Sequence, residues 1–75
     1  MTVKIIAFGQ IAEITGKNFE AHAADTNELE GWLRKNFPAL ENKKFAIAVN
    51  KRIVSGIEKL NENDEVALMP PYSGG

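Results

Sequence analysis

The stretch DTNELEGWLRKNFP, residues 25–38, is the strongest indication of the fold because it has the period of an amphipathic helix. Its large apolar side chains recur at i, i+3, i+4 and i+8 and so form one stripe: Leu29, Trp32, Leu33 and Phe37. A stripe of this kind has to be covered by another layer of structure. We therefore predict a helix that packs against a sheet, with Trp32, Leu33 and Phe37 in the core beneath it.

Both ends of this helix carry recognisable signals. Asp25 and Thr26 are good N-cap residues, and the spacing from Asp25 to Glu28 resembles a capping box. Pro38 ends the helix, because the residue before a proline is pushed out of the helical region. The predicted helix therefore starts at Asp25 or Thr26 and stops at Phe37.

Short apolar runs, several of them rich in β-branched residues, surround the helix and predict strands. In the first run, Val3, Ile5 and Ala7 would share one face, with Ile6 and Phe8 on the other. Residues 10–14 are expected to form one helical turn, and residues 40–44 a polar connection. The predicted strands are Val3–Phe8, Phe19–Ala23, Phe45–Val49, Ile53–Val54 and Glu65–Met69.

Turn signals separate the later strands. Residues 50–52 form a tight turn, and residues 61–64 form another in which Asn63 accepts a left-handed backbone. The order β, β, α, β, short β and β predicts an α+β domain of the β-grasp (ubiquitin-like) type. Its mixed sheet has one main helix packed across one face.

Composition excludes several classes of function. The chain has 75 residues, nine Lys and Arg against ten Asp and Glu, and no cysteine. It therefore has no disulfide or thiolate metal site, and no basic surface for nucleic acid or an anionic membrane. We find no signal peptide and no apolar run of the ~20 residues that span a bilayer, and we expect a mature, complete cytoplasmic protein with no metal site.

The last six residues, Pro70-Pro71-Tyr72-Ser73-Gly74-Gly75, do not fit a sheet. Two prolines favour an extended conformation that projects the chain away from the body. Gly74 and Gly75 have no side chain, so the terminal carboxylate can enter a narrow channel in another protein. We therefore divide the chain into a β-grasp domain, residues 1–69, and an extended tail, residues 70–75. The alternative is an ordinary disordered end.

With this tail, the sequence resembles the sulfur-carrying small subunits of molybdopterin synthase over essentially its whole length. The tail is the most distinctive match, because related carriers for thiazole formation also end in Gly-Gly but usually lack the double proline. Asn63 stands where the family usually has glycine, and Ala12 where some members carry a basic residue, which puts one partner contact in doubt. The other matching segments are residues 5–10, residues 48–50 with Ile53-Val54, and residues 60–66.

The resemblance implies a chemistry that is centred on Gly75. An adenylating enzyme of the ubiquitin-activating type would use ATP and Mg²⁺ to form an acyl-adenylate on Gly75, and a persulfide donor would then convert it to a thiocarboxylate. The tail would next enter the large subunit of molybdopterin synthase, where sulfur passes to cyclic pyranopterin monophosphate. The family also implies a heterotetramer of two small and two large subunits. No cofactor is expected to stay bound to this chain.

The resemblance also assigns contact residues. Gly74 gives the terminus access to the partner, and Pro70, Pro71, Tyr72 and Ser73 follow it into the large subunit. Phe8, Ile53 and Met69 would form an apolar patch around the base of the tail; the alternative is that they fill a second small core. We assign no catalytic role to the polar residues His22, Lys51, Arg52, Asp64 and Glu65, which fit a strand surface, a hairpin tip and a turn.

Three other functions remain open from the sequence. A sulfur carrier for thiamine thiazole synthesis or tRNA thiolation would need the same tail. A ubiquitin-like covalent modifier would end in an isopeptide bond to lysine instead of a thiocarboxylate. A pure binding module would carry its Gly-Gly end by coincidence and would bind its partner without Gly75.

Overall fold

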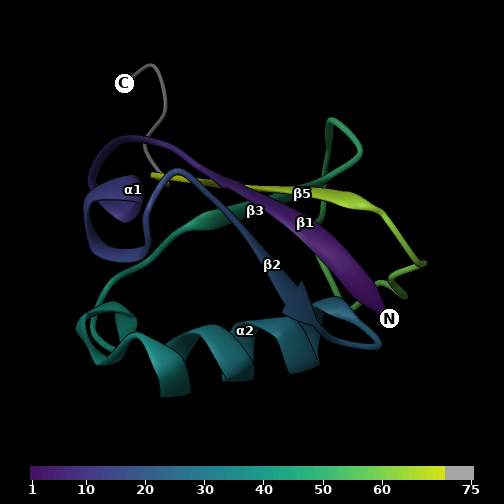
Figure 1. Cartoon of the computed structure of the whole chain (residues 1–75), viewed down its shortest axis with the longest axis horizontal. Coiled ribbons are helices and arrows are strands. Elements are labelled where there is room, and N and C mark those ends of the chain that lie inside the picture. Colours follow the sequence, from purple (N-terminus) through teal and green to yellow (C-terminus); the bar gives the residue numbers. More distant parts are fainter. Residues whose placement is uncertain (71–75) are drawn as a thin grey trace.

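The computed structural model describes residues 1–70 and confirms the predicted fold class. One five-stranded sheet has the order β2-β1-β5-β3-β4, and the main helix α2 runs across one of its faces (Figure 1). The elements are β1 (Thr2–Ala7), α1 (Gly9–Thr15), β2 (Asn18–His22), α2 (Thr26–Asn36), the short 3₁₀ helix η1 (Pro38–Leu40), β3 (Ala46–Val49), β4 (Arg52–Ile53) and β5 (Glu65–Met69).

The sheet is mixed, as predicted. Its two central strands, β1 and β5, run parallel, so the first and last strands of the chain lie side by side. The other neighbours are antiparallel: β1 with β2, β3 with β5, and β3 with β4. A parallel pair needs a long crossover, and here the chain between β1 and β5 supplies the rest of the domain.

The core lies between the sheet and α2. The predicted inward set of β1 is confirmed, because Val3, Ile5 and Ala7 are at most 4% exposed. Val66 and Leu68 of β5 lie beside them, and Leu29 and Leu33 of α2 cover them with no exposed surface. Each of these large side chains contributes about 1.5–3 kcal/mol through burial, so this layer holds most of the hydrophobic stabilisation.

The predicted cap of α2 is confirmed with one change. The Asp25 carboxylate accepts a hydrogen bond from the Glu28 N–H at 2.7 Å, as in a capping box. The Glu28 carboxylate, however, accepts from the N–H of Ala24 at 3.0 Å and not from that of Asp25. This contact ties the first turn of α2 to the chain that leaves β2.

The structure corrects three sequence predictions. Leu40, placed in a polar connection, is fully buried, because η1 turns it back under α2. Trp32 and Phe37, assigned to the core, are only half-buried at its edge, where they pack against Phe19 of β2. The helical turn predicted over residues 10–14 is the seven-residue helix α1. The boundaries of the other elements agree with the prediction to within one residue.

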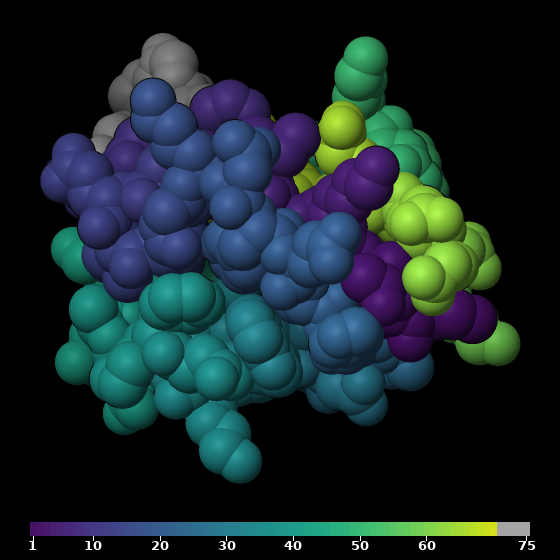
Figure 2. Space-filling model, in the orientation of Figure 1, coloured from purple at the N-terminus to yellow at the C-terminus, as the bar shows by residue number. Residues whose placement is uncertain are grey.

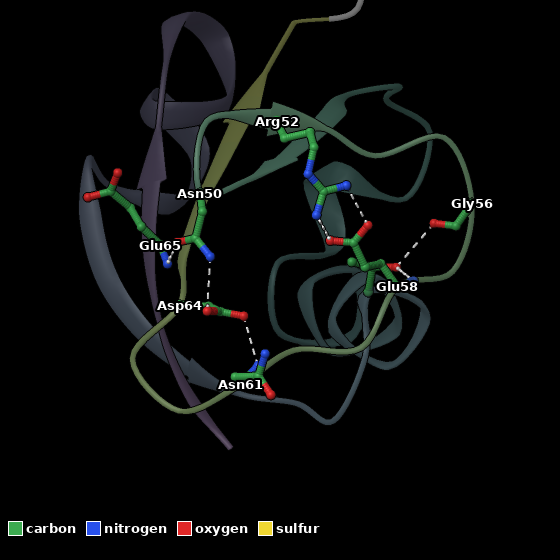
Figure 3. Close-up of polar contacts among 8 residues, drawn as sticks. Asn50, Arg52, Gly56, Glu58, Asn61, Asp64 and Glu65 are labelled. Carbon is green, nitrogen blue, oxygen red and sulfur yellow. Dashed lines mark hydrogen bonds and ion pairs between the residues drawn. The ribbon is translucent and has the colours of Figure 1, made fainter.

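A polar network fixes the hairpin between β3 and β4 to the start of β5 (Figure 3). Asn50 and Lys51 both have positive φ, which is the geometry of a tight hairpin turn. Asn63 has φ of 68°, which confirms the left-handed backbone predicted for it. The Asn50 amide donates to the Asp64 carboxylate at 3.0 Å and accepts from the Glu65 N–H at 3.1 Å. Asp64 therefore joins two turns that are far apart in the sequence.

A second group of contacts in Figure 3 anchors the loop that follows β4. Thr26 is buried, its hydroxyl donates to the carbonyl oxygen of Gly56 at 3.3 Å, and it accepts from the Glu58 N–H at 2.9 Å. The Glu58 carboxylate holds Arg52 through two hydrogen bonds, at 2.9 and 2.7 Å. Lys51 and Arg52 are both exposed at the hairpin, as predicted, but the sequence did not show that Arg52 pairs with Glu58.

These contacts predict a pH dependence of stability. The Asn61 N–H and then the Asn50 amide donate to the Asp64 carboxylate and hold its pKa below the ordinary value. A carboxyl whose pKa is lowered by folding stabilises the folded state at neutral pH, and this contribution is lost as pH falls through the folded pKa. The destabilisation by Asp64→Asn, measured by urea unfolding, should therefore shrink between neutral pH and pH values below about 3.9. A destabilisation that stays constant with pH would contradict this role of Asp64.

Candidate functional site

The face of the sheet opposite α2, here called the outer face, carries a row of apolar side chains. Alternation along each strand puts the residues between the inward ones on this face. Towards β2 and the start of β5 the outer face is polar, with Lys4, Glu20 and Glu65 in neighbouring register positions. Its other end is apolar and consists of Ile6, Phe8, Ala46, Ala48, Ile53, Ala67 and Met69.

The predicted patch residues lie on this apolar end. Phe8 follows β1 and donates its N–H to the carbonyl oxygen of Leu68 at 3.0 Å, which puts it beside Met69. Ile53 of β4 lies two strands away from Met69 of β5. The small residues Ala48 and Ala67 lie between them on the outer face, since Ala48 pairs with both Ile53 and Ala67. Phe8 is 48% exposed and Ile53 is 61% exposed. The alternative that these two residues fill a second core is therefore wrong.

The base of the tail is fixed beside this patch. β5 ends at Met69, where the sequence predicted the end of the sheet, and Pro70 follows it. Gly9 has φ of +57°, and a Cβ at this position would lie 3.1 Å from Cγ of Pro70. The sequence predicted only that the first strand ends at Phe8, just before Gly9. The close approach of Pro70 could not be foreseen, because the two residues are 61 positions apart and meet only through the β1–β5 pairing.

Five predicted site residues lie outside the described part of the chain. They form the end of the tail: Pro71, Tyr72, Ser73, Gly74 and Gly75. The roles assigned to them stay predictions. The structure places only the point from which they start, at the apolar end of the outer face.

An open depression of about 490 Å³ adjoins the patch on the side of α1. Ile6 and Phe8 form part of its apolar wall, and Glu13 and Lys17 place one charge of each sign on its lining. Ala12, the position at which some members of the resembled family carry a basic residue, also lines it.

The polar residues that received no catalytic role have ordinary structural environments. His22 is exposed on β2 and its Nδ1 lies 3.0 Å from the Thr2 hydroxyl. Asp64 is a turn residue, as predicted, but Glu65 is the first residue of β5 rather than part of the turn. Within residues 1–70 no three His, Asp or Glu side chains are grouped in a way that could hold a metal ion.

Comparison with known proteins gives the family. The model of the ThiS family matches residues 5–75. The chain belongs to the ThiS family. The match includes the end of β1, the apolar end of the outer face and the tail, so it covers every residue of the candidate site.

Individual relatives agree with this assignment. The molybdopterin synthase sulfur carrier subunit of Escherichia coli is 36% identical, over 97% of this chain and 99% of the relative. The subunit of the same name from Chlamydomonas reinhardtii is 35% identical over the full length of both chains. A chain from the complex of subunits 1 and 2 of the molybdopterin-converting factor of Helicobacter pylori superposes with a TM-score of 0.77, at 31% identity and full coverage of both chains.

The helices of this ThiS family member are short. Across the described residues, none has both the length and the apolar character needed to span a lipid bilayer. The longest, α2, has 11 residues and buries only one side against the sheet.

The contact between Gly9 and Pro70 predicts opposite effects for two glycine substitutions. Gly9→Ala should lower the free energy of unfolding by about 1–2 kcal/mol, because alanine resists the left-handed backbone and its Cβ would press on Pro70. Gly31→Ala is the matched control, since Gly31 lies in α2 with open space around it and should gain up to about 1 kcal/mol. Urea unfolding of both variants checks this, and equal effects would show that Gly9 is not constrained.

Proposed function

We propose that this protein is the sulfur carrier subunit of a molybdopterin synthase. The observation that carries the proposal is similarity along the whole chain, tail included, to proteins known as molybdopterin synthase sulfur carrier subunits. The ThiS family assignment supports it. In this role the protein has no chemistry to perform inside its own core, and what matters is where the core holds the tail.

The reactive group in this proposal is the carboxylate of Gly75. A carboxylate is a poor acyl donor, so an adenylating enzyme first transfers AMP from ATP to one of its oxygens, with Mg²⁺ bound to that enzyme, and pyrophosphate leaves. The sulfur of a persulfide donor then attacks the carbonyl carbon and AMP leaves. Cleavage of the resulting disulfide by a thiol yields the thiocarboxylate. Since the chain has no cysteine, a persulfide cannot form on its own side chains.

The tail delivers this group to a partner. Pro70 starts against Gly9, and we propose that Pro71, Tyr72 and Ser73 line the entrance of a channel in the partner while Gly74 and Gly75 pass through it. Residues without a Cβ fit a channel that excludes larger side chains. The acid, base and pterin-binding groups then belong to the large subunit, in a heterotetramer of two small and two large subunits.

The outer face is the proposed docking surface for that large subunit. The structure of the Helicobacter pylori complex contains both subunits of its converting factor, which supports a large-subunit partner for a chain of this family. Phe8 and Ile53 offer exposed apolar surface, and the half-buried Met69 lies beside Phe8 at the point from which the tail leaves. Apolar residues in the centre of an interface contribute most when water is excluded around them. Docking on this face therefore orients the tail towards the partner.

The intact mass of the protein tests this proposal. After incubation with ATP, Mg²⁺, a cognate adenylating enzyme and a persulfide donor, the full chain should gain the mass difference between one sulfur and one oxygen atom. The same chain without Gly75 should gain nothing, because its new terminus is one residue short of the adenylating site.

Other outcomes would contradict the proposal in different ways. An unchanged mass, in a reaction whose components thiolate another carrier, would exclude the sulfur carrier role. Linkage of the terminus to a lysine of another protein would identify a covalent modifier. Thiolation without any support of molybdopterin formation would assign the carrier to thiazole synthesis or tRNA thiolation.

A further inference from the structure

The sheet has a free edge at β2. The Ala7 N–H donates to the Lys17 carbonyl oxygen at 2.9 Å, and the Ala23 N–H donates to the Met1 carbonyl oxygen at 3.0 Å. In an antiparallel ladder such bonds occur at every second residue, so the odd-numbered residues of this strand face β1. The N–H and C=O groups of the even-numbered residues, Asn18, Glu20 and His22, therefore point away from the sheet.

No other described segment covers this edge. Within residues 1–70, the backbone groups of Asn18, Glu20 and His22 form no hydrogen bond beyond the strand. Figure 2 shows the blue atoms around β2 as a continuous part of the visible surface, directly next to the teal atoms of α2. An uncovered strand edge is a template for pairing with an extended chain.

An aromatic cluster lies beside the edge, on the side of the sheet that faces α2. Phe19 of β2 stacks on Trp32 with ring centroids 6.3 Å apart, and Phe37 lies 5.6 Å from Phe19 and 6.2 Å from Trp32. All three rings are half-buried, so part of each remains in contact with water. Large apolar side chains that stay partly exposed beside an edge provide surface for an incoming chain.

The cluster lies on the side of α2 that is next to β2. Glu28, one helical turn before Trp32, reaches the N–H of Ala24 just after β2. The opposite side of α2 faces the other end of the sheet, where Arg34 lies over the ring of Phe45 with its guanidinium carbon 5.0 Å from the centroid. Trp32 therefore belongs to the side of the helix that runs along the free edge.

We propose that β2 is a docking site for an extended peptide segment of another protein, which adds to the sheet as a sixth strand. The residue opposite Glu20 exchanges both backbone hydrogen bonds with it and places its side chain on the outer face beside the Glu20 carboxylate. Lys4 lies opposite Glu20 on β1, with Glu65 on its other side, but Glu20 forms no ion pair within the described residues. This position therefore selects lysine or arginine. The two neighbouring residues point to the other face, over Phe19 and Trp32, and are apolar.

A second copy of this chain fits the edge less well than such a peptide. Antiparallel pairing of β2 with itself along its whole length places Glu20 opposite Glu20, and like charges directly opposite each other destabilise a sheet. A contact of five-residue strands also buries far less than the ~1,200 Å² of a stable dimer interface. The charge of Glu20 thus disfavours self-pairing and favours a basic partner strand.

The test uses an acetylated and amidated peptide with the central sequence Val-Lys-Val between serine and glycine residues. Titration to millimolar peptide should change the fluorescence of Trp32, the single tryptophan of the chain, and shift the backbone amide signals of residues 17–23. Methylation of the central lysine nitrogen removes a donor to β2 and should weaken binding about tenfold. Methylation of a flanking valine nitrogen, which points to solvent, should leave binding within about twofold.

A charge exchange tests the specificity of the site. Glu20→Lys should weaken binding of the Val-Lys-Val peptide by about fivefold, and this variant should bind a Val-Glu-Val peptide with the affinity that was lost. Equal weakening by both methylated peptides, or shifts confined to the apolar end of the outer face, would overturn the proposal. So would signals of residues 17–23 that move with protein concentration and not with peptide, since they would identify a second copy as the occupant. Thiocarboxylate formation on Gly75 should be unaffected by Glu20→Lys. The test of peptide binding at β2 is therefore independent of the test of the carrier role.

Discussion

The parallel pairing of β1 with β5 is the constraint on which the rest of the molecule depends. It joins residues 4–7 to residues 65–68 across almost the whole length of the chain. Because both strands are central, their inward side chains form the floor of the core that α2 covers. Their shared end also sets the position of the candidate site, because Phe8 follows β1 and Met69 ends β5 at the same end of the sheet. Without this register, Pro70 would not meet Gly9 and the tail would have no fixed origin.

The sequence was sufficient for the parts of the fold that depend on short-range patterns. Alternation in β1, the apolar stripe of α2 and the Asp25 cap each gave the right element, because each reflects a local geometric rule. Leu40 and Trp32 were misplaced for the opposite reason. Whether an apolar side chain becomes fully buried depends on which distant segment covers it, and the local pattern of a sequence does not show which segment this is. The register that brings Phe8 beside Met69 was likewise visible only in the folded sheet.

The candidate site divides into a surface and a terminus. The family resemblance and the double-proline tail could be recognised in the sequence, but only the 61% exposure of Ile53 in the structure decided between a surface patch and a second core. A carrier of this kind needs two properties that a small domain can provide without a catalytic centre. One is an apolar face that a partner can recognise, and the other is a terminus that fits into the partner's active site. The polar network around Asp64 fixes the β3–β4 hairpin, which carries Ile53 on the apolar end of the outer face.

The separation into a docking surface and a reactive terminus is best tested by the rate of molybdopterin formation. This rate is measured against the concentration of the thiocarboxylated protein, with the concentration of the large subunit held constant. Ile53→Asp should raise the concentration for half-maximal rate about tenfold, the cost of losing one apolar contact in the interface, and leave the maximal rate within about twofold. Ile57→Asp is the matched control, because Ile57 is also exposed, at 73%, but lies in the loop beyond β4 and off the outer face. It should behave like the unchanged protein. Equal concentration dependence for all three proteins, or a lower maximal rate for Ile53→Asp alone, would contradict the account.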